Sequence, residues 1–92
     1  MGIQPISADT DLIVRVLAFA RARELLGAHE LTYAAEPGAS LGEVWLALVD
    51  RHPRLAELRG VTRFARNGRL AEGFERIEDG DEIALLPPVG GG

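Results

Sequence analysis

The sequence predicts an α+β fold in which one main helix crosses one face of a mixed sheet of four or five strands. A single long amphipathic helical pattern at residues 41–49 stands between strand-like segments. With 92 residues, the chain has room for one domain and one core. We expect that domain at residues 12–86, after a disordered N-terminal extension at 1–11 and before a flexible tail at 87–92.

The main helix has a start signal and one apolar stripe. Ser40 and Glu43 form the S-x-x-E capping box that is typical of a helix N-terminus. Behind the box, apolar side chains recur at the spacing of one helix face: Leu41, Val44, Trp45, Leu48 and Val49. Pro53 stops the pattern. We therefore expect Trp45 to belong to the core.

Three strands and a short helix account for much of the remaining chain. Residues 12–19 are apolar on both faces, which favours a strand in the middle of the sheet. Residues 20–26 predict a short helix that ends at Gly27. Residues 30–35 alternate between apolar and polar, as in a half-buried strand, and residues 82–86 predict the last strand.

The second half of the chain is rich in turn signals. Asn67-Gly68 predicts a type I′ hairpin between short strands at 62–66 and 69–71. Asp79-Gly80-Asp81 is interpreted as a turn, because a Ca²⁺ loop needs about six oxygen ligands at fixed spacing. We expect four further apolar side chains to be buried, the first two in a helical turn: Leu55, Leu58, Phe74 and Ile77.

Composition excludes several classes of function. The net charge of −4 argues against a nucleic-acid partner, and no segment is long and apolar enough to span a membrane. The chain has no cysteine, which removes disulfides and thiolate chemistry and fits a cytoplasmic protein. All ten basic residues are arginine. The absence of lysine reflects either genome composition or a benefit of lacking amines that would capture an activated C-terminus.

The usual catalytic and metal-binding sets are missing from the sequence. His29 and His52 stand far apart with no cysteine between them, so we expect no metal site. Ser40 is explained as a helix cap, and Ser7 has no evident triad. The C-terminal glycines lack the lysine and the following helix of a phosphate-binding loop. We therefore expect that the domain catalyses nothing alone and binds no cofactor.

The C-terminus is the most distinctive feature of the sequence. Pro87-Pro88 ends strand pairing, because proline has no backbone N–H for the ladder. The four residues Val89–Gly92 can extend by ~13–14 Å, and three of them are glycines. Such a tail can thread a narrow channel in a partner and present its α-carboxylate there. A carboxylate is a poor electrophile, so an ATP-dependent partner is needed to activate it.

Several segments of the sequence resemble those of a known family. The sequence is similar to the MoaD/ThiS family of ubiquitin-like β-grasp sulfur carriers, and within it to the small subunit of molybdopterin synthase. The resemblance covers residues 12–92 and rests on residues 19–25, Asn67, residues 79–82 and above all the end, Leu85–Gly92. The family commonly ends in two apolar residues followed by Pro-Pro-Val-x-Gly-Gly.

The resemblance implies a mechanism. An adenylyltransferase related to ubiquitin-activating enzymes would use ATP and Mg²⁺ to adenylate the Gly92 carboxylate, and a sulfur source would convert it to a thiocarboxylate. Gly91 and Gly92 would then enter the large subunit of molybdopterin synthase and give sulfur to cyclic pyranopterin monophosphate in molybdenum cofactor biosynthesis. The implied assembly is a heterotetramer of two small and two large subunits.

Strand alternation predicts where a partner docks. If the helix packs on one face of the last strand, apolar side chains remain on the other face. We expect the partner-binding residues to be on this face and in the tail: Phe19, Leu70, Leu86, Pro87, Pro88, Val89 and Gly90. Three arginines are candidates to flank the patch: Arg15, Arg63 and Arg66. The alternative is that Phe19 is buried in a minor core.

Other functions remain open from the sequence. The carrier could serve thiamin, cysteine or tRNA thiolation, although thiamin carriers are typically shorter. A ubiquitin-like modifier would form isopeptide bonds through the same Gly92 carboxylate. A pure interaction domain would have no use for the glycine tail.

Overall fold

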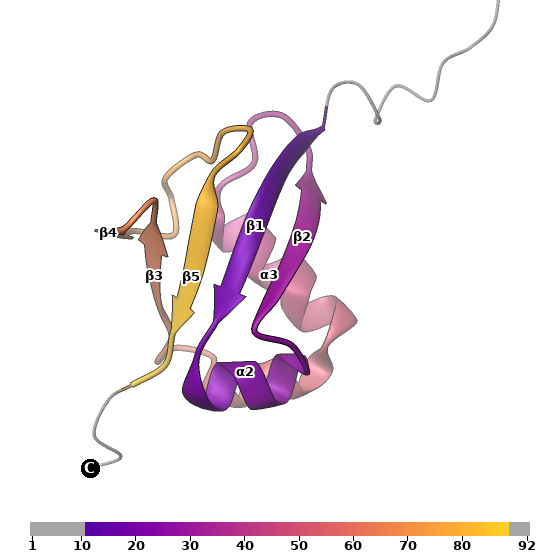
Figure 1. Ribbon diagram of the computed structural model, residues 1–92, viewed down its shortest axis with the longest axis vertical. Coiled ribbons are helices and arrows are strands. Elements are labelled where there is room, and N and C mark those ends of the chain that lie inside the picture. The colour runs from indigo at the N-terminus through magenta and orange to yellow at the C-terminus, as the bar shows by residue number, and fades with distance from the viewer. Residues whose placement is uncertain (1–10, 89–92) are drawn as a thin grey trace, which may run out of the picture.

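The computed structural model describes residues 11–88, which form a five-stranded sheet with the main helix across one face (Figure 1). The elements in chain order are β1 (Leu12–Ala18), α2 (Ala20–Leu26), β2 (Glu30–Ala35), α3 (Leu41–Arg51), the 3-10 helix η1 (Pro53–Leu58), β3 (Arg63–Arg66), β4 (Arg69–Ala71) and β5 (Glu82–Leu86). The strand order is β2-β1-β5-β3-β4, with β1 and β5 parallel and the other neighbours antiparallel. The predicted architecture is confirmed. Residues 1–10 of the predicted extension and residues 89–92 of the predicted tail lie outside the described residues.

The core lies between the sheet and α3. Alternate side chains of β1 and β5 point into it, and the exposed fraction of each is at most 1%: Val14, Val16, Ile83 and Leu85. The stripe predicted for the main helix is buried against them at Leu41, Val44, Trp45 and Leu48. Burial of a side chain of this size stabilises the fold by ~1.5–3 kcal/mol relative to an exposed one. One face of the sheet therefore provides most of the hydrophobic stabilisation.

The N-terminus of α3 has the predicted capping box. Ser40 Oγ accepts from the Glu43 amide at 3.2 Å, and Glu43 Oε1 accepts from the Ser40 amide at 2.8 Å. The next two backbone amides, of Leu41 and Gly42, donate to carbonyls of the 73–75 loop at 2.9 and 2.8 Å. These bonds satisfy the free donors of the first helical turn and fasten the loop after β4 to the helix.

The same loop explains one wrong prediction. Phe74 is expected in the core but is 79% exposed. The carbonyls of Gly73 and Glu75, on either side of it, accept the hydrogen bonds from α3. The loop thus faces the helix with its backbone, and the Phe74 side chain points to solvent. Ile77 and both leucines of η1 are buried as predicted.

Several turns require left-handed backbone conformations. Asn67 and Gly68 have φ of 52° and 84°, as a type I′ hairpin requires, and Gly27 after α2 has φ of 83°. Phe19 is extended and caps α2 instead of ending the first strand. Ala20, the first helical residue, has φ of 52°, which is unfavourable for a residue with a Cβ atom.

Candidate docking face and base of the C-terminal tail

One face of the sheet has no helix across it in the described part of the chain (Figure 1). Its side chains come from the strand positions that alternate with the core. In β5, Ile83 and Leu85 are buried, whereas Ala84 and Leu86 are half-buried, as the alternation predicts. We call this side the open face.

A row of four apolar side chains crosses the open face. The strand register pairs Leu17 of β1 with Ala84 of β5. It then pairs Ala84 with Ala65 of β3, and Ala65 with Leu70 of β4. Leu70 is 68% exposed. The row therefore ends at the sheet edge on a large side chain that lies mostly in water.

Phe19 and Leu86 lie two residues beyond Leu17 and Ala84, Leu86 as the last residue of β5 and Phe19 directly after β1. Ala18 pairs with Leu85, so Phe19 and Leu86 are the residues that directly follow this last pair of the two parallel strands. The extended backbone of Phe19 continues the alternation of β1 and turns its side chain to the open face. Phe19 is 48% exposed, so the alternative in which it is buried in a minor core is wrong.

Val61 belongs to the same surface, and sequence reasoning missed it. It is 48% exposed and lines one hollow together with Leu70 and Pro88, which come from two other segments of the chain. The sequence offered one signal: Val61 stands two residues before Arg63, so strand alternation assigns both to the same face. Arg63 pairs with Leu86 and therefore lies on the open face. We define the apolar face as Leu17, Phe19, Val61, Ala65, Leu70, Ala84 and Leu86.

The three candidate arginines are placed differently around the apolar face. Arg63 borders it, and its side chain has no ion pair within residues 11–88. Arg15 also lies on the open face but is paired with glutamates of β2 and β5. Arg66 pairs with Ile83, whose side chain is buried in the core. Arg66 therefore lies on the core side of the sheet and not on the open face. The expectation that Arg66 flanks the patch is therefore wrong.

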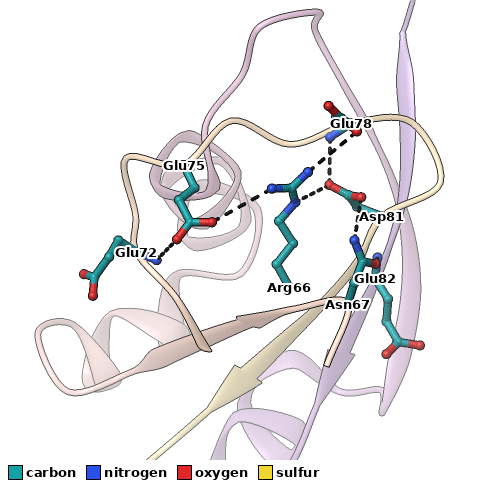
Figure 2. Close-up of polar contacts among 7 residues, drawn as sticks. All are labelled: Arg66, Asn67, Glu72, Glu75, Glu78, Asp81 and Glu82. Carbon is teal, nitrogen blue, oxygen red and sulfur yellow. Dashed lines mark hydrogen bonds and ion pairs between the residues drawn. The ribbon is translucent and has the colours of Figure 1, made fainter. Parts of the chain in front are cut away.

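Arg66 instead joins a group of polar residues between the β3–β4 hairpin and the segment that leads from β4 to β5, shown in Figure 2. We call this group the Arg66 network: Arg66, Asn67, Glu72, Glu75, Glu78, Asp81 and Glu82. Asp81, only 5% exposed, is its centre. Asp81 Oδ2 accepts from Arg66 Nε and from the Glu78 amide, each at 2.7 Å, and Oδ1 accepts from Asn67 Nδ2 at 2.8 Å.

These contacts determine the charge state of Asp81. Burial alone would raise the pKa of its carboxyl group, but the hydrogen bonds from Asn67, Glu78 and Arg66 and the charge of Arg66 outweigh burial and lower it. The hydrogen bond to Asp81 in turn raises the pKa of Arg66. Asp81 is therefore a carboxylate at neutral pH, held by protein donors.

The acidic loop before β5 is a turn, as predicted. Asp79 Oδ1 accepts from the Ile13 amide at 2.7 Å, and the Gly80 amide donates to the Ile13 carbonyl at 2.8 Å. In the described range, no three His, Cys, Asp or Glu side chains are grouped to hold a metal ion. No helix among residues 11–88 is both long and apolar enough to cross a membrane.

The tail begins beside the apolar face. β5 ends at Leu86, Pro87 is half-buried, and Pro88 is exposed at the wall of the hollow. The structure thus brings Phe19, Leu86 and the two prolines to one end of the sheet, with Leu70 at the neighbouring edge. The other predicted site residues lie outside the described residues: Val89, Gly90, Gly91 and Gly92.

Comparison with known proteins establishes the family. Residues 16–92 match the sequence profile of the ThiS family. The chain belongs to the ThiS family. A molybdopterin synthase sulfur carrier subunit of Arabidopsis thaliana is 36% identical to this ThiS-family chain over 87 residues, covering 94% of the chain and 91% of the relative.

Solved structures of similar proteins agree with this assignment. Small archaeal modifier protein 1 of Haloferax volcanii superposes with a TM-score of 0.78 at 31% identity, covering 87% of this chain and 99% of that one. In a complex of subunits 1 and 2 of the molybdopterin-converting factor from Helicobacter pylori, a chain matches with a TM-score of 0.65 at 30% identity, covering 88% and 100%. A Caldiarchaeum subterraneum ubiquitin, at 20% identity and a TM-score of 0.60 over 89% and 99%, shares the fold alone. The fold is thus the ubiquitin-like β-grasp.

Proposed function

We propose that the chain is the sulfur carrier subunit of a molybdopterin synthase. Its Gly92 carboxylate would be adenylated and converted to a thiocarboxylate that donates sulfur to cyclic pyranopterin monophosphate. The observation that carries this proposal is the 36% identity, over nearly the whole of both chains, to a protein named as such a subunit. The complex of subunits 1 and 2 of the molybdopterin-converting factor supports a large-subunit partner.

The chemistry belongs to Gly92 and to enzymes that act on it. Attack of the carboxylate on the α-phosphate of ATP releases pyrophosphate and leaves an acyl adenylate. Hydrosulfide, supplied by a sulfur source, then displaces AMP from the acyl carbon and leaves the thiocarboxylate. The activating enzyme supplies ATP and Mg²⁺, and this chain binds neither. Each sulfur delivered leaves a carboxylate on Gly92 that can be activated again, and a cytoplasmic location gives both partners access to ATP and substrate.

The folded domain supplies recognition. Gly90, Gly91 and Gly92 carry no side chains, so they offer a partner little more than backbone. The apolar face is the surface on which we propose that the large subunit and the activating enzyme dock, because large exposed apolar patches mark protein interfaces. Two large and two small subunits would then form the heterotetramer, with a small subunit at each end.

A second function is favoured by one specific observation. One structure that superposes with a TM-score of 0.78 is that of a small archaeal modifier protein. A modifier would use the same adenylate but transfer Gly92 to a lysine amine of a target. The 92 residues of this chain contain no lysine, so its own side chains offer no amine for conjugation to a second copy.

Intact-mass measurement on protein purified from its own cells separates the two functions. A sulfur carrier gains the mass difference between sulfur and oxygen at its C-terminus, and the gain disappears in cells without the activating enzyme. A modifier instead appears as conjugates with other proteins. Recovery of only the unmodified chain, with no conjugates, from cells that are making molybdenum cofactor would refute both.

A further inference from the structure

β4 carries Leu70 but has few contacts of its own. It is an edge strand of three residues, and β3 is its partner in the sheet. Leu70, its middle residue, is 68% exposed, so core packing does little to hold the side chain in place. The position of Leu70 therefore depends on what holds the two ends of β4.

The first end is held at the hairpin turn (Figure 2). Asn67 Nδ2 donates to Asp81 Oδ1 at 2.8 Å, and Asn67 Oδ1 accepts from the Glu82 amide at 2.9 Å. The Asn67 amide also donates to the Glu82 carbonyl at 2.8 Å. Arg66, the residue before the turn, donates from Nε to Asp81 Oδ2 at 2.7 Å. The turn is thus fastened to the start of β5, the central strand.

The second end is held through the same guanidinium. The Glu72 amide, directly after β4, donates to Glu75 Oε2 at 2.9 Å. The other oxygen of Glu75 lies 3.9 Å from a terminal nitrogen of Arg66, and a Glu78 oxygen lies 3.8 Å from the other. Arg66 therefore connects the turn before β4 with the loop after it.

Loss of one hydrogen bond from the Arg66 network should be costly. Asp81 is nearly fully buried, and no buried side-chain nitrogen or oxygen within residues 11–88 lacks a hydrogen-bond partner. Asp81 is the buried member of the network, so removal of Arg66 or Asn67 leaves its carboxylate buried with one hydrogen bond fewer, which costs more than the bond itself contributes. The loss of one contact should therefore shift the hairpin as a whole.

We propose that Asp81 and Asn67 are positioning residues for docking, which hold β4 so that Leu70 meets the partner surface. Both residues lie outside the apolar face and act through the backbone of β4. The inference rests on the proposed function, because it requires that Leu70 contacts a partner.

Two variants and one matched control test this role. Asp81→Asn removes the charge at nearly constant volume. Asn67→Gly removes the side chain, while glycine keeps the left-handed conformation of the turn. The control is Asp79→Asn, an equivalent change in the same loop at a carboxylate that contacts the Ile13 amide of β1 and not the hairpin.

The first measurement needs no partner. Amide hydrogen exchange of residues 64–71 in the free protein should accelerate about tenfold or more in Asp81→Asn and Asn67→Gly, with β1 and β2 unchanged. The control should exchange as the unsubstituted protein does in the hairpin. Unchanged exchange of the hairpin in both variants would overturn the positioning role.

The second measurement is titration calorimetry with the molybdopterin synthase large subunit from the same organism. Both variants should bind at least fivefold more weakly, and the control should bind normally. In the Leu70→Ala background, Asp81→Asn should cause no further loss, because it acts through Leu70. Normal binding by both variants, or a loss that adds fully to that of Leu70→Ala, would overturn the inference. Failure of the unsubstituted chain to bind would refute the proposed function instead, and hydrogen exchange would then decide the positioning role.

Discussion

Replacement of Leu70 by alanine should separate docking from folding. Leu70 is 68% exposed, whereas Leu48 of α3 is 1% exposed. Full burial of a leucine contributes ~1.5–3 kcal/mol, so the buried third of Leu70 contributes only ~0.5–1 kcal/mol to the free energy of unfolding. Leu48→Ala removes a fully buried side chain and should cost ~2–5 kcal/mol.

The effects on binding should have the opposite order. Truncation of a central interface anchor costs ~1–3 kcal/mol, which weakens Kd about 5- to 150-fold at 1.4 kcal/mol per decade. Leu70→Ala should lose affinity for the large subunit by that factor. The folded fraction of Leu48→Ala keeps its open face and should bind normally. Calorimetric titrations measure the affinity of each variant for the large subunit, and melting curves measure the stability of each.

Two results would refute this reasoning. If Leu70→Ala binds as tightly as the unsubstituted chain, the docking surface lies elsewhere. If Leu70→Ala unfolds at as low a temperature as Leu48→Ala, the Leu70 side chain stabilises the fold and is not a docking residue. Phe19→Ala provides an independent check on the same face, with a larger stability cost, because about half of its surface is already buried.

Three further predictions follow from the tail, the Arg66 network and the start of α2. Deletion of Gly92, or addition of one residue after it, should leave circular dichroism unchanged and abolish sulfur transfer, because the carboxylate moves by ~3.5 Å. Full turnover by the deletion variant would contradict the role of that residue. The pKa of Asp81 is lower in the folded protein than in the unfolded chain, where it is about 3.9. Ionised Asp81 therefore stabilises the fold above about pH 3.9, and this stabilisation is lost as the pH falls through the pKa of the folded state. Denaturant titrations between pH 5 and pH 2 should therefore show a steeper loss for the unsubstituted chain than for Asp81→Asn, and parallel curves would refute this linkage. Ala20→Gly should raise the free energy of unfolding by ~0.5–1 kcal/mol, because glycine removes the strain of the left-handed conformation. A lower melting temperature for that variant would mean that the strain is absent.

Local patterns predicted most elements because short-range physics sets their ends. The capping box, the left-handed Gly27 and the Asn67-Gly68 turn each act within a few residues and are found as expected. Misplaced details depended on contacts that no short sequence pattern indicates. Thr62 is predicted in a strand, but its hydroxyl donates to the Leu58 carbonyl at 3.0 Å, and β3 begins one residue later.

Some residues of the candidate site could likewise be predicted from local patterns, and others could not. Strand alternation is a local rule, and it correctly predicted that Leu86 and Phe19 face away from the core. Val61 was missed because its hollow forms only when three separate segments meet. Asp81 was recognised as a turn residue, but no sequence pattern indicates that its carboxylate will meet Arg66 across 15 positions of the chain.

The position of β5 connects docking with chemistry. β5 lies between β1 and β3, so the chain leaves the fold from the middle of the sheet and not from an edge. Leu86 is both the last residue of β5 and a member of the apolar face, so a partner that covers this face also covers the root of the tail. Four extended residues span at most ~13–14 Å. A partner that binds the apolar face must therefore open its active site within that distance of Pro88, and this geometric requirement applies equally to an activating enzyme and to a synthase subunit.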